Sequence, residues 1–216
     1  MTSPRRIVSR RGYQVLDPGF YLDRTDRVAR RLLGCMLVRV LGDEVLAGRI
    51  VETEAYFPDN DPACHAHRGM TERNRVMFEQ GGVAYVYFAY GNHFLFNAVT
   101  GREGRPAAVL IRAVEPVEGV DRMRANRPGR PDAELANGPG KLARAFGITK
   151  ELNGADLTDS PLMIARGRAA GKTAGNGARF RIGRSGRIGI REAQNRLARF
   201  YIAGNRYVSV RRERVA

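Results

Sequence analysis

The chain has 216 residues, 43% of them hydrophobic, which is enough to bury the core of one domain and requires no second. Its 37 basic and 22 acidic side chains give a net charge of +15, and all but three of the basic residues are arginines, which favours a nucleic-acid partner over a membrane surface. The most apolar stretch, residues 107–111, is far shorter than the roughly 20 residues of a transmembrane helix, and the first residues contain no apolar run of signal-peptide length. These features argue against a membrane protein, and we expect a cytoplasmic protein that works on the nucleoid.

The beginning of the chain predicts a flexible basic arm. Residues 1–14 are largely polar and include four arginines, a composition typical of a mobile terminal segment that either touches phosphates or stays solvated. The remaining residues, 15–216, are expected to form the single domain. Its first helix is predicted from Thr25, where apolar residues begin to recur at helical spacing, to Gly34, which can end the last turn.

Segments rich in β-branched and aromatic residues alternate with turns of Gly, Asp and Asn and predict strands. These segments are residues 36–41, 45–56, 84–89, 93–100, 106–113, 180–190 and 200–210. Helices are predicted at residues 118–126 and 140–146, and a mobile basic loop at residues 165–179. Because tight turns join most neighbouring strands, we expect a mixed α/β (α+β) fold, in which helices surround one curved, largely antiparallel sheet with a protruding β-hairpin.

Acidic and aromatic residues gather on the predicted strands. Because side chains alternate along a strand, Glu52, Glu54 and Tyr56 share one face. Further tyrosines occur on the strand at residues 84–89, and Arg112 lies near the end of another strand. A carboxylate beside aromatic rings indicates a pocket that grips a flat ring and performs acid/base chemistry next to it. In a cationic protein, that ring is expected to be a nucleobase.

Weaker patterns suggest other sites. Cys64, His65 and His67 lack the second ligand pair of a structural zinc site, and the two aspartates that precede them have no visible partner set for magnesium, so we expect no metal. The segment 137–141 lacks the first glycine and the hydroxyl residue of a P-loop. It is expected either to face a DNA phosphate or to be an ordinary helix cap.

The order of the motifs resembles that of the alkyladenine (3-methyladenine) DNA glycosylase family, the monofunctional enzymes of base-excision repair. The resemblance runs in order over roughly residues 15 to 210. The matching segments are Arg49 to Tyr56, Asp61 to His65, Arg73-Asn74, Met77-Phe78, Tyr85 to Gly91, Asn97, Val109 to Ala113, Glu115-Pro116, Asn137 to Leu142 and Arg199 to Ile202.

The resemblance implies an enzyme that flips a damaged purine, such as 3-methyladenine or hypoxanthine, out of duplex DNA and hydrolyses its N-glycosidic bond. Such an enzyme initiates base-excision repair, and this chain is expected to need no cofactor and to bind damaged duplex DNA as a monomer. Two other classes stay open. One is a non-catalytic nucleic-acid-binding protein whose tyrosines stack on bases, and the other is a metal-dependent nuclease.

The resemblance also implies a role for each site residue. Glu54 matches the general base that activates water, and Arg112 matches the residue that holds this water and the carboxylate. Tyr56 and His65 on one side and Tyr87 on the other match the walls that stack on the base. The other matches are Asn97, which crowds the exocyclic amine of guanine, and Tyr90, which fills the gap left in the duplex. Apart from the resemblance, Glu52 is expected to be a supporting or structural carboxylate.

Overall fold

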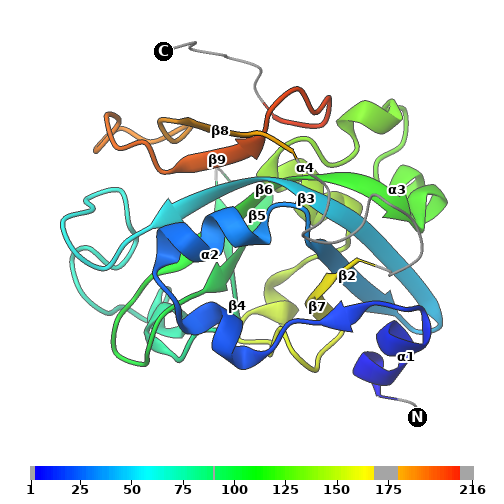
Figure 1. Cartoon of the computed structure of the whole chain (residues 1–216), viewed down its shortest axis with the longest axis horizontal. Helices are drawn as coiled ribbons and strands as arrows, with labels where there is room; N and C mark the ends of the chain where they lie inside the picture. Colours follow the sequence, from blue (N-terminus) through cyan, green and yellow to red (C-terminus); the bar gives the residue numbers. More distant parts are fainter. Residues whose placement is uncertain (1–2, 90, 168–179, 210–216) are drawn as a thin grey trace.

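Nine strands form one sheet in the part of the chain that the computed structural model describes, residues 3–89, 91–167 and 180–209 (Figure 1). Paired strands are antiparallel, in the order β1-β7-β2-β3-β6-β5-β4, with β9 joined to β3 and β8 joined to β9. The strands are β1 (Gln14–Val15), β2 (Met36–Leu41), β3 (Glu44–Tyr56), β4 (Ala84–Ala89), β5 (His93–Val99), β6 (Ala108–Glu118), β7 (Leu162–Arg166), β8 (Ile182–Ser185) and β9 (Arg199–Ile202). The predicted mixed α/β fold with a curved antiparallel sheet is confirmed.

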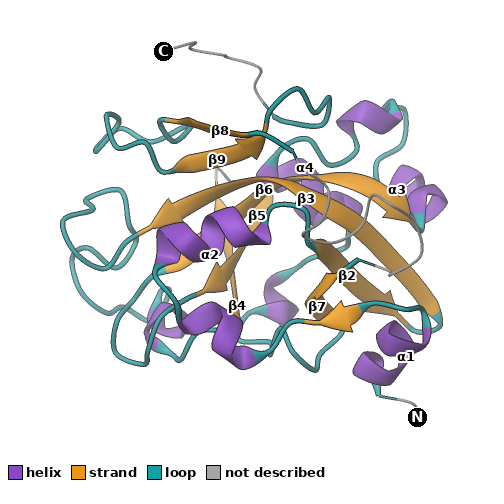
Figure 2. Cartoon of the chain, viewed as in Figure 1, coloured by secondary structure: helices purple, strands orange, loops and turns teal. Residues whose placement is uncertain are grey.

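Strand β3 organises the sheet around it. It has 13 residues, of which 47–56 pair with β6 along one edge, while two strands share the other edge. β2 pairs with residues 44–49 of β3, and β9 pairs with residues 52–54. The second half of β3 therefore lies between β6 and the C-terminal hairpin β8–β9, which Figure 2 shows next to it.

Three irregularities interrupt the pairing of β3 with β6, and the first, between Ala47 and Gly48, leaves Val117 as an extra residue in β6. The register shifts between Ile50 and Glu52, which leaves Val51 as an extra residue in β3, and shifts again between Glu52 and Thr53, which leaves Arg112 as an extra residue in β6. Such bulges bend a strand and redirect its side chains. The bulge at Arg112 brings this residue opposite the acidic stretch of β3.

Helices pack around this sheet (Figure 2). In the described residues they are α1 (Pro4–Arg10), α2 (Thr25–Leu32), α3 (Val120–Asn126) and α4 (Pro139–Ala145), with short 3₁₀ turns at Pro18–Leu22, Arg75–Phe78, Asp132–Glu134 and Lys150–Leu152. α2 packs on β3 and buries Val28, Ala29 and Leu32, the residues whose spacing predicted it. Gly34 follows with φ of 85°, a left-handed conformation that glycine adopts at little cost after a helix.

Helix α1 lies within residues 1–14, for which we predicted a flexible arm. Its Val8 is fully buried and packs with Tyr13 and with apolar residues of β2 and β7. Val8 is one of only two apolar side chains of the helix, the other being Ile7, in a basic stretch. With only two neighbouring apolar residues, the sequence of this helix is hard to distinguish from that of a polar tail. The division of the chain into an arm and a domain stays a prediction.

The two closing strands are shorter than the sequence predicts. β8 and β9 have four residues each, and residues 186–198 between them form a loop. Gly189 has φ of 74°, which is incompatible with a continuous strand. The predicted basic loop at 165–179 lies mostly outside the described residues. Its described beginning belongs to β7, which extends to Arg166.

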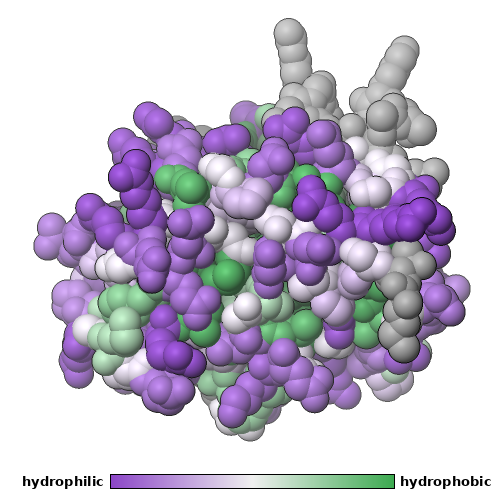
Figure 3. Space-filling model, turned by 90° about the horizontal axis from the view of Figure 1, so that it is seen from below, coloured by the Kyte–Doolittle hydropathy of each residue, from purple (hydrophilic) through white to green (hydrophobic). Residues whose placement is uncertain are grey.

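The surface is mainly polar. Hydrophilic side chains predominate on the face drawn in Figure 3, and hydrophobic residues form small, separate patches there. Among the described residues, no helix is long and apolar enough to cross a membrane. The apolar side chains are instead used in the interior, where one large cluster joins α2, the sheet and α4.

Candidate active site

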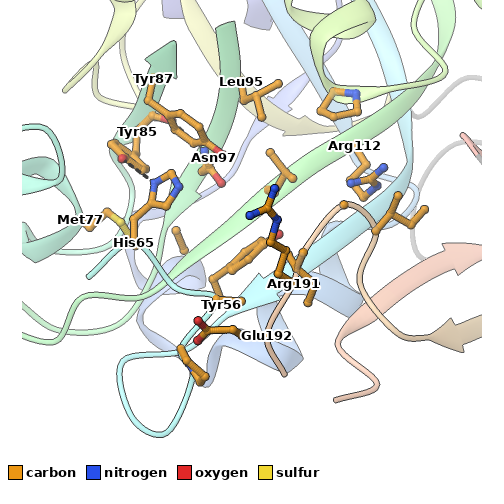
Figure 4. Close-up of a pocket in the computed structure, with 18 residues that line it drawn as sticks. Tyr56, His65, Met77, Tyr85, Tyr87, Leu95, Asn97, Arg112, Arg191 and Glu192 are labelled. Atoms are coloured by element: carbon orange, nitrogen blue, oxygen red, sulfur yellow. Dashed lines mark hydrogen bonds between the residues drawn. The ribbon is translucent and has the colours of Figure 1, made fainter. Parts of the chain in front are cut away.

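A cavity of about 430 Å³ opens between the sheet and two loops (Figure 4). Strands β4, β5 and β6 form its floor, the loop after β3 forms one wall, and the loop between β8 and β9 forms another. The lining residues are Tyr56, Pro62, Ala63, His65, Met77, Tyr85, Tyr87, Leu95, Asn97, Ala108, Leu110, Arg112, Pro139, Ile188, Gly189, Ile190, Arg191 and Glu192. The size of this cavity is in the range of small-ligand sites.

One side of the cavity is a cluster of three rings. Tyr85 and Tyr87 point the same way from β4, because they are two residues apart on a strand. The His65 ring lies edge-on to Tyr87, with 4.5 Å between ring centroids, and its Nδ1 is 3.0 Å from the Tyr85 hydroxyl oxygen. Partial removal from water, reinforced by the charge of Arg73, lowers the pKa of His65, so the ring is uncharged at neutral pH.

His65 therefore lies with Tyr87, whereas we predicted it on the side of Tyr56. Figure 4 shows Tyr56 apart from this cluster of three rings. The physical reason is the hydrogen bond between His65 and Tyr85, which attaches the loop residue to β4. Asn74 strengthens the attachment, because its side-chain amide donates to the His65 carbonyl oxygen over 3.0 Å.

Tyr56 is fixed at both its hydroxyl and its ring. The hydroxyl donates to Glu54 Oε2 over 2.9 Å, and the Arg187 guanidinium lies over the ring, 4.6 Å from its centroid. Arg187 in turn donates to both carboxylate oxygens of Asp61 over 2.6 Å, and neither side chain of this pair is exposed. The pair therefore ties the loop after β3 to the loop after β8 and holds Tyr56 between them.

Glu54 lies directly behind the cavity wall. It is fully buried, and the three residues that its carboxylate contacts, Tyr56, Ile188 and Arg112, all line the cavity. Its Oε1 accepts from the Ile188 backbone N–H over 2.7 Å and lies 3.3 Å from Arg112 Nη1. Burial raises the pKa of Glu54, and Arg112, the Ile188 N–H and the Tyr56 hydroxyl offset this only in part.

Glu52 has more charged partners than Glu54. Its Oε1 accepts from Arg112 Nε over 2.8 Å and from Arg199 Nε over 2.6 Å, and its Oε2 accepts from the Ser209 N–H over 2.7 Å. Burial alone would raise the pKa of Glu52, but Arg112 and Arg199 outweigh it, and the net shift is downward. Two carboxylates two residues apart are thus driven in opposite directions, Glu52 towards a permanent charge and Glu54 towards a stronger base.

Asn97 faces the cavity from β5. Its side-chain Nδ2 donates to the Tyr85 carbonyl oxygen over 3.1 Å, and the residue is 4% exposed. With the nitrogen held in this way, the amide oxygen is turned towards the cavity, as Figure 4 shows. A fixed polar group at this position can discriminate between the polar edges of bound rings.

The structure thus brings together most of the predicted site residues. Tyr56, His65, Tyr87, Asn97 and Arg112 line one cavity. Glu54 lies one layer behind them, and Tyr90, the predicted wedge, lies outside the described residues.

The sequence reasoning missed the contribution of the loop between β8 and β9. This loop supplies the Ile188 N–H to Glu54 and the guanidinium of Arg187 to Tyr56. Predicting a strand over 180–190 concealed it. The glycines at 183, 186 and 189 were the available signal, because regularly spaced glycines weaken a strand and favour close backbone approach.

The residues considered as metal ligands have other surroundings. Cys64 is buried in the packing beneath the loop after β3, and burial raises the pKa of its thiol to about 11. His65 is bonded to Tyr85, and His67 is exposed. Across residues 3–89, 91–167 and 180–209, no three His, Cys, Asp or Glu side chains are grouped so that they could hold a metal ion.

Comparison with known proteins identifies relatives along nearly the whole chain. The family model described as "Methylpurine-DNA glycosylase (MPG)" matches residues 19–206. A protein of Carboxydothermus hydrogenoformans is 48% identical over 191 residues, which cover 88% of this chain and 96% of the relative. A protein of Methanoculleus marisnigri is 48% identical over 200 residues, covering 91% and 99%. Both are named "Putative 3-methyladenine DNA glycosylase".

Proposed function

The chain belongs to the methylpurine-DNA glycosylase family and is a DNA glycosylase, a hydrolase of N-glycosyl bonds, and we propose that it excises 3-methyladenine and hypoxanthine from duplex DNA to start base-excision repair. The observation that carries this proposal is the cavity between Tyr56 and the ring cluster of His65 and Tyr87, with Glu54 directly behind it. We further propose that the protein works as a monomer, with the open side of the cavity facing the DNA.

The damaged base is proposed to leave the helix and enter this cavity, because its glycosidic bond is inaccessible inside a stacked duplex. Tyr56 on one side and Tyr87 on the other would stack on its faces. Electron-poor rings, among them the positively charged 3-methyladenine, stack well on electron-rich phenols. The uncharged His65 adds a ring without adding a repelling charge. Tyr90 is proposed to fill the space that the flipped nucleotide leaves, which offsets part of the cost of unstacking.

Hydrolysis is proposed to use Glu54 as the general base. A water oxygen attacks C1′ of the sugar, the bond from C1′ to the base nitrogen breaks with its electron pair leaving on the base, and a water proton passes to Glu54. The raised pKa of Glu54 makes it a better proton acceptor than an exposed glutamate. An ionised carboxylate also stabilises the positive charge that develops on the sugar.

The contacts of Glu54 are compatible with this role. A carboxylate offers about four lone-pair positions, and the Tyr56 hydroxyl, the Ile188 N–H and Arg112 occupy three. The fourth is proposed to receive the attacking water, with Arg112 holding both the water and the carboxylate. Arg112 is suited to this task because it lines the cavity and contacts Glu54 at the same time.

Asn97 is proposed to exclude normal guanine. Its amide is fixed by the Tyr85 carbonyl and is nearly buried, so it cannot move aside for an additional exocyclic amine. Hypoxanthine lacks that amine and would be accepted. Selection would thus rest on the cost of crowding a fixed polar group and leaving it unpaired.

One assay tests the proposed function against the two other classes. The protein is incubated in EDTA with duplexes that contain hypoxanthine or 3-methyladenine, and free base and alkali-labile abasic sites are measured. Release of free base with an intact backbone before alkali is expected. Binding without any base release would support a non-catalytic binder, and EDTA-sensitive strand scission without free base would support a nuclease.

A further inference from the structure

Tyr56 and Tyr87 both line the cavity, and each carries a guanidinium on its ring. Arg187 lies over Tyr56, 4.6 Å from the ring centroid, and Arg73 lies over Tyr87, 5.3 Å from the ring centroid. Neither arginine lines the cavity. Both guanidiniums therefore cover ring faces that a bound base does not use.

The two arginines differ in how their charge is compensated. The side chains of Arg187 and its partner Asp61 have no exposure, so the pair is neutral as a unit. Arg73 is exposed, and its Nη2 donates to the Phe88 carbonyl oxygen at the end of β4 over 3.1 Å. No carboxylate forms an ion pair with it within the described ranges. The positive charge of Arg73 behind Tyr87 is thus not balanced by a carboxylate, whereas the charge of Arg187 behind Tyr56 is balanced by Asp61.

An uncompensated cation on one face of a phenol changes the opposite face. The attraction between a cation and an aromatic ring comes from the negative charge of the ring faces. The Arg73 guanidinium polarises the ring electrons of Tyr87 towards itself. The opposite face of the ring, which lines the cavity, therefore carries less negative charge and attracts a second cation more weakly. The two positive charges also repel each other through the thin, low-dielectric ring. A neutral base experiences neither effect to the same degree.

We propose that Arg73 is a specificity-determining residue that weakens the preference of the cavity for positively charged purines and so extends its range to neutral ones. The inference rests on the proposed excision of damaged purines. What it adds is a residue that sets the balance between the two proposed substrates, the neutral, deaminated purine and the cationic, alkylated purine. The charge of the Arg73 guanidinium causes this change in preference, and it acts on the bound base through the contact between Arg73 and the Tyr87 ring.

The test compares three variants in single-turnover excision of 3-methyladenine, which is cationic, and of hypoxanthine, which is neutral. Arg73→Gln removes the charge, Arg73→Lys keeps it, and Arg75→Gln removes the same charge from an exposed residue two positions along the chain. Arg73→Gln is expected to raise the ratio of the 3-methyladenine rate to the hypoxanthine rate about threefold. The ratios for Arg73→Lys and Arg75→Gln are expected to stay near the wild-type value.

Each other outcome has a definite meaning. An unchanged ratio in Arg73→Gln, an equal change in Arg75→Gln, or a lysine variant that behaves like the glutamine variant would overturn the inference. Because both rates come from one preparation, partial unfolding or weaker DNA binding scales them alike and leaves the ratio intact. A wild-type protein that releases neither base would instead refute the proposed function itself.

Discussion

Arg112 donates from Nε to Glu52 Oε1 over 2.8 Å, and both side chains lie almost entirely out of contact with water. The same guanidinium reaches Glu54 through Nη1. Arg112 can therefore serve the cavity only while Glu52 holds it, and the bulge that makes Arg112 an extra residue in β6 is what permits this geometry. The proposed role of Arg112 thus depends on the carboxylate of Glu52, which does not itself line the cavity.

Replacing Glu54 should separate binding from chemistry. Glu54→Gln keeps the shape of the side chain and loses the base, so base release should fall by about 10³-fold, while affinity for a damaged duplex is largely retained. Gel shift and single-turnover excision measure the two properties. Glu44→Gln, at the exposed start of the same strand, is the matched control and should leave both unchanged. Normal excision by Glu54→Gln would remove Glu54 from the mechanism.

The rate of excision should show an acid limb set by Glu54. Burial raises the pKa of this carboxyl above the ordinary value of 4.5. Only the ionised form accepts a proton from water, so the rate should fall as the pH drops through the raised pKa and level off above it. Single-turnover rates on hypoxanthine between pH 4 and 8 measure the limb. A midpoint at or below the ordinary value contradicts the assignment.

Removing the carboxylate of Glu52 should destabilise the fold strongly. Glu52→Ala leaves the buried Arg112 and Arg199 without their counter-ion, which should cost about 3–5 kcal/mol of unfolding free energy. Glu115→Ala also breaks an ion pair with an arginine, Arg49, but one that water reaches, so it should cost about 1 kcal/mol or less. Urea unfolding measures both. Equal losses would show that the buried network contributes no special stability.

Two aspartates of one loop offer a second matched comparison. Asp61→Ala leaves Arg187 buried and unpaired and should cost about 3 kcal/mol, whereas Asp59→Ala breaks an exposed pair with Arg105 and should cost less than about 0.5 kcal/mol. Asp61→Ala should also lower excision, because Arg187 no longer holds Tyr56. Thermal unfolding and excision rates test both effects, and parallel behaviour of the two variants would exclude a special role for Asp61.

The same pair has a predictable dependence on pH. Burial alone would raise the pKa of Asp61, but the hydrogen bonds from Arg187 outweigh it and the net shift is downward from 3.8. The stabilisation is therefore complete above that value and is lost as the pH falls below it. The difference in unfolding free energy between wild type and Asp61→Ala should accordingly shrink in acid. A difference that grows in acid would contradict the sign of the shift.

Local patterns predicted the central strands and the residues on them. The hairpins that became β2–β3 and β4–β5 follow from β-branched residues around turns, and alternation alone placed Glu52, Glu54 and Tyr56 on one face. The sequence could not reveal the bulge at Arg112, because a register shift depends on the partner strand. Nor could it place His65, whose side of the cavity is decided by a hydrogen bond to Tyr85, twenty residues further along the chain.

Because β9 pairs with the acidic half of β3, the candidate active site can be completed only after nearly the whole chain has been synthesised. Arg199 and Ser209, two of the donors to Glu52, are among the last described residues to be synthesised, and the loop that carries Ile188 is held in place by β8 and β9. A chain released by the ribosome before Arg199 keeps its tyrosines but lacks the support behind its carboxylates. We therefore expect prematurely terminated copies to be inactive, a useful property in an enzyme whose product is an abasic site in DNA.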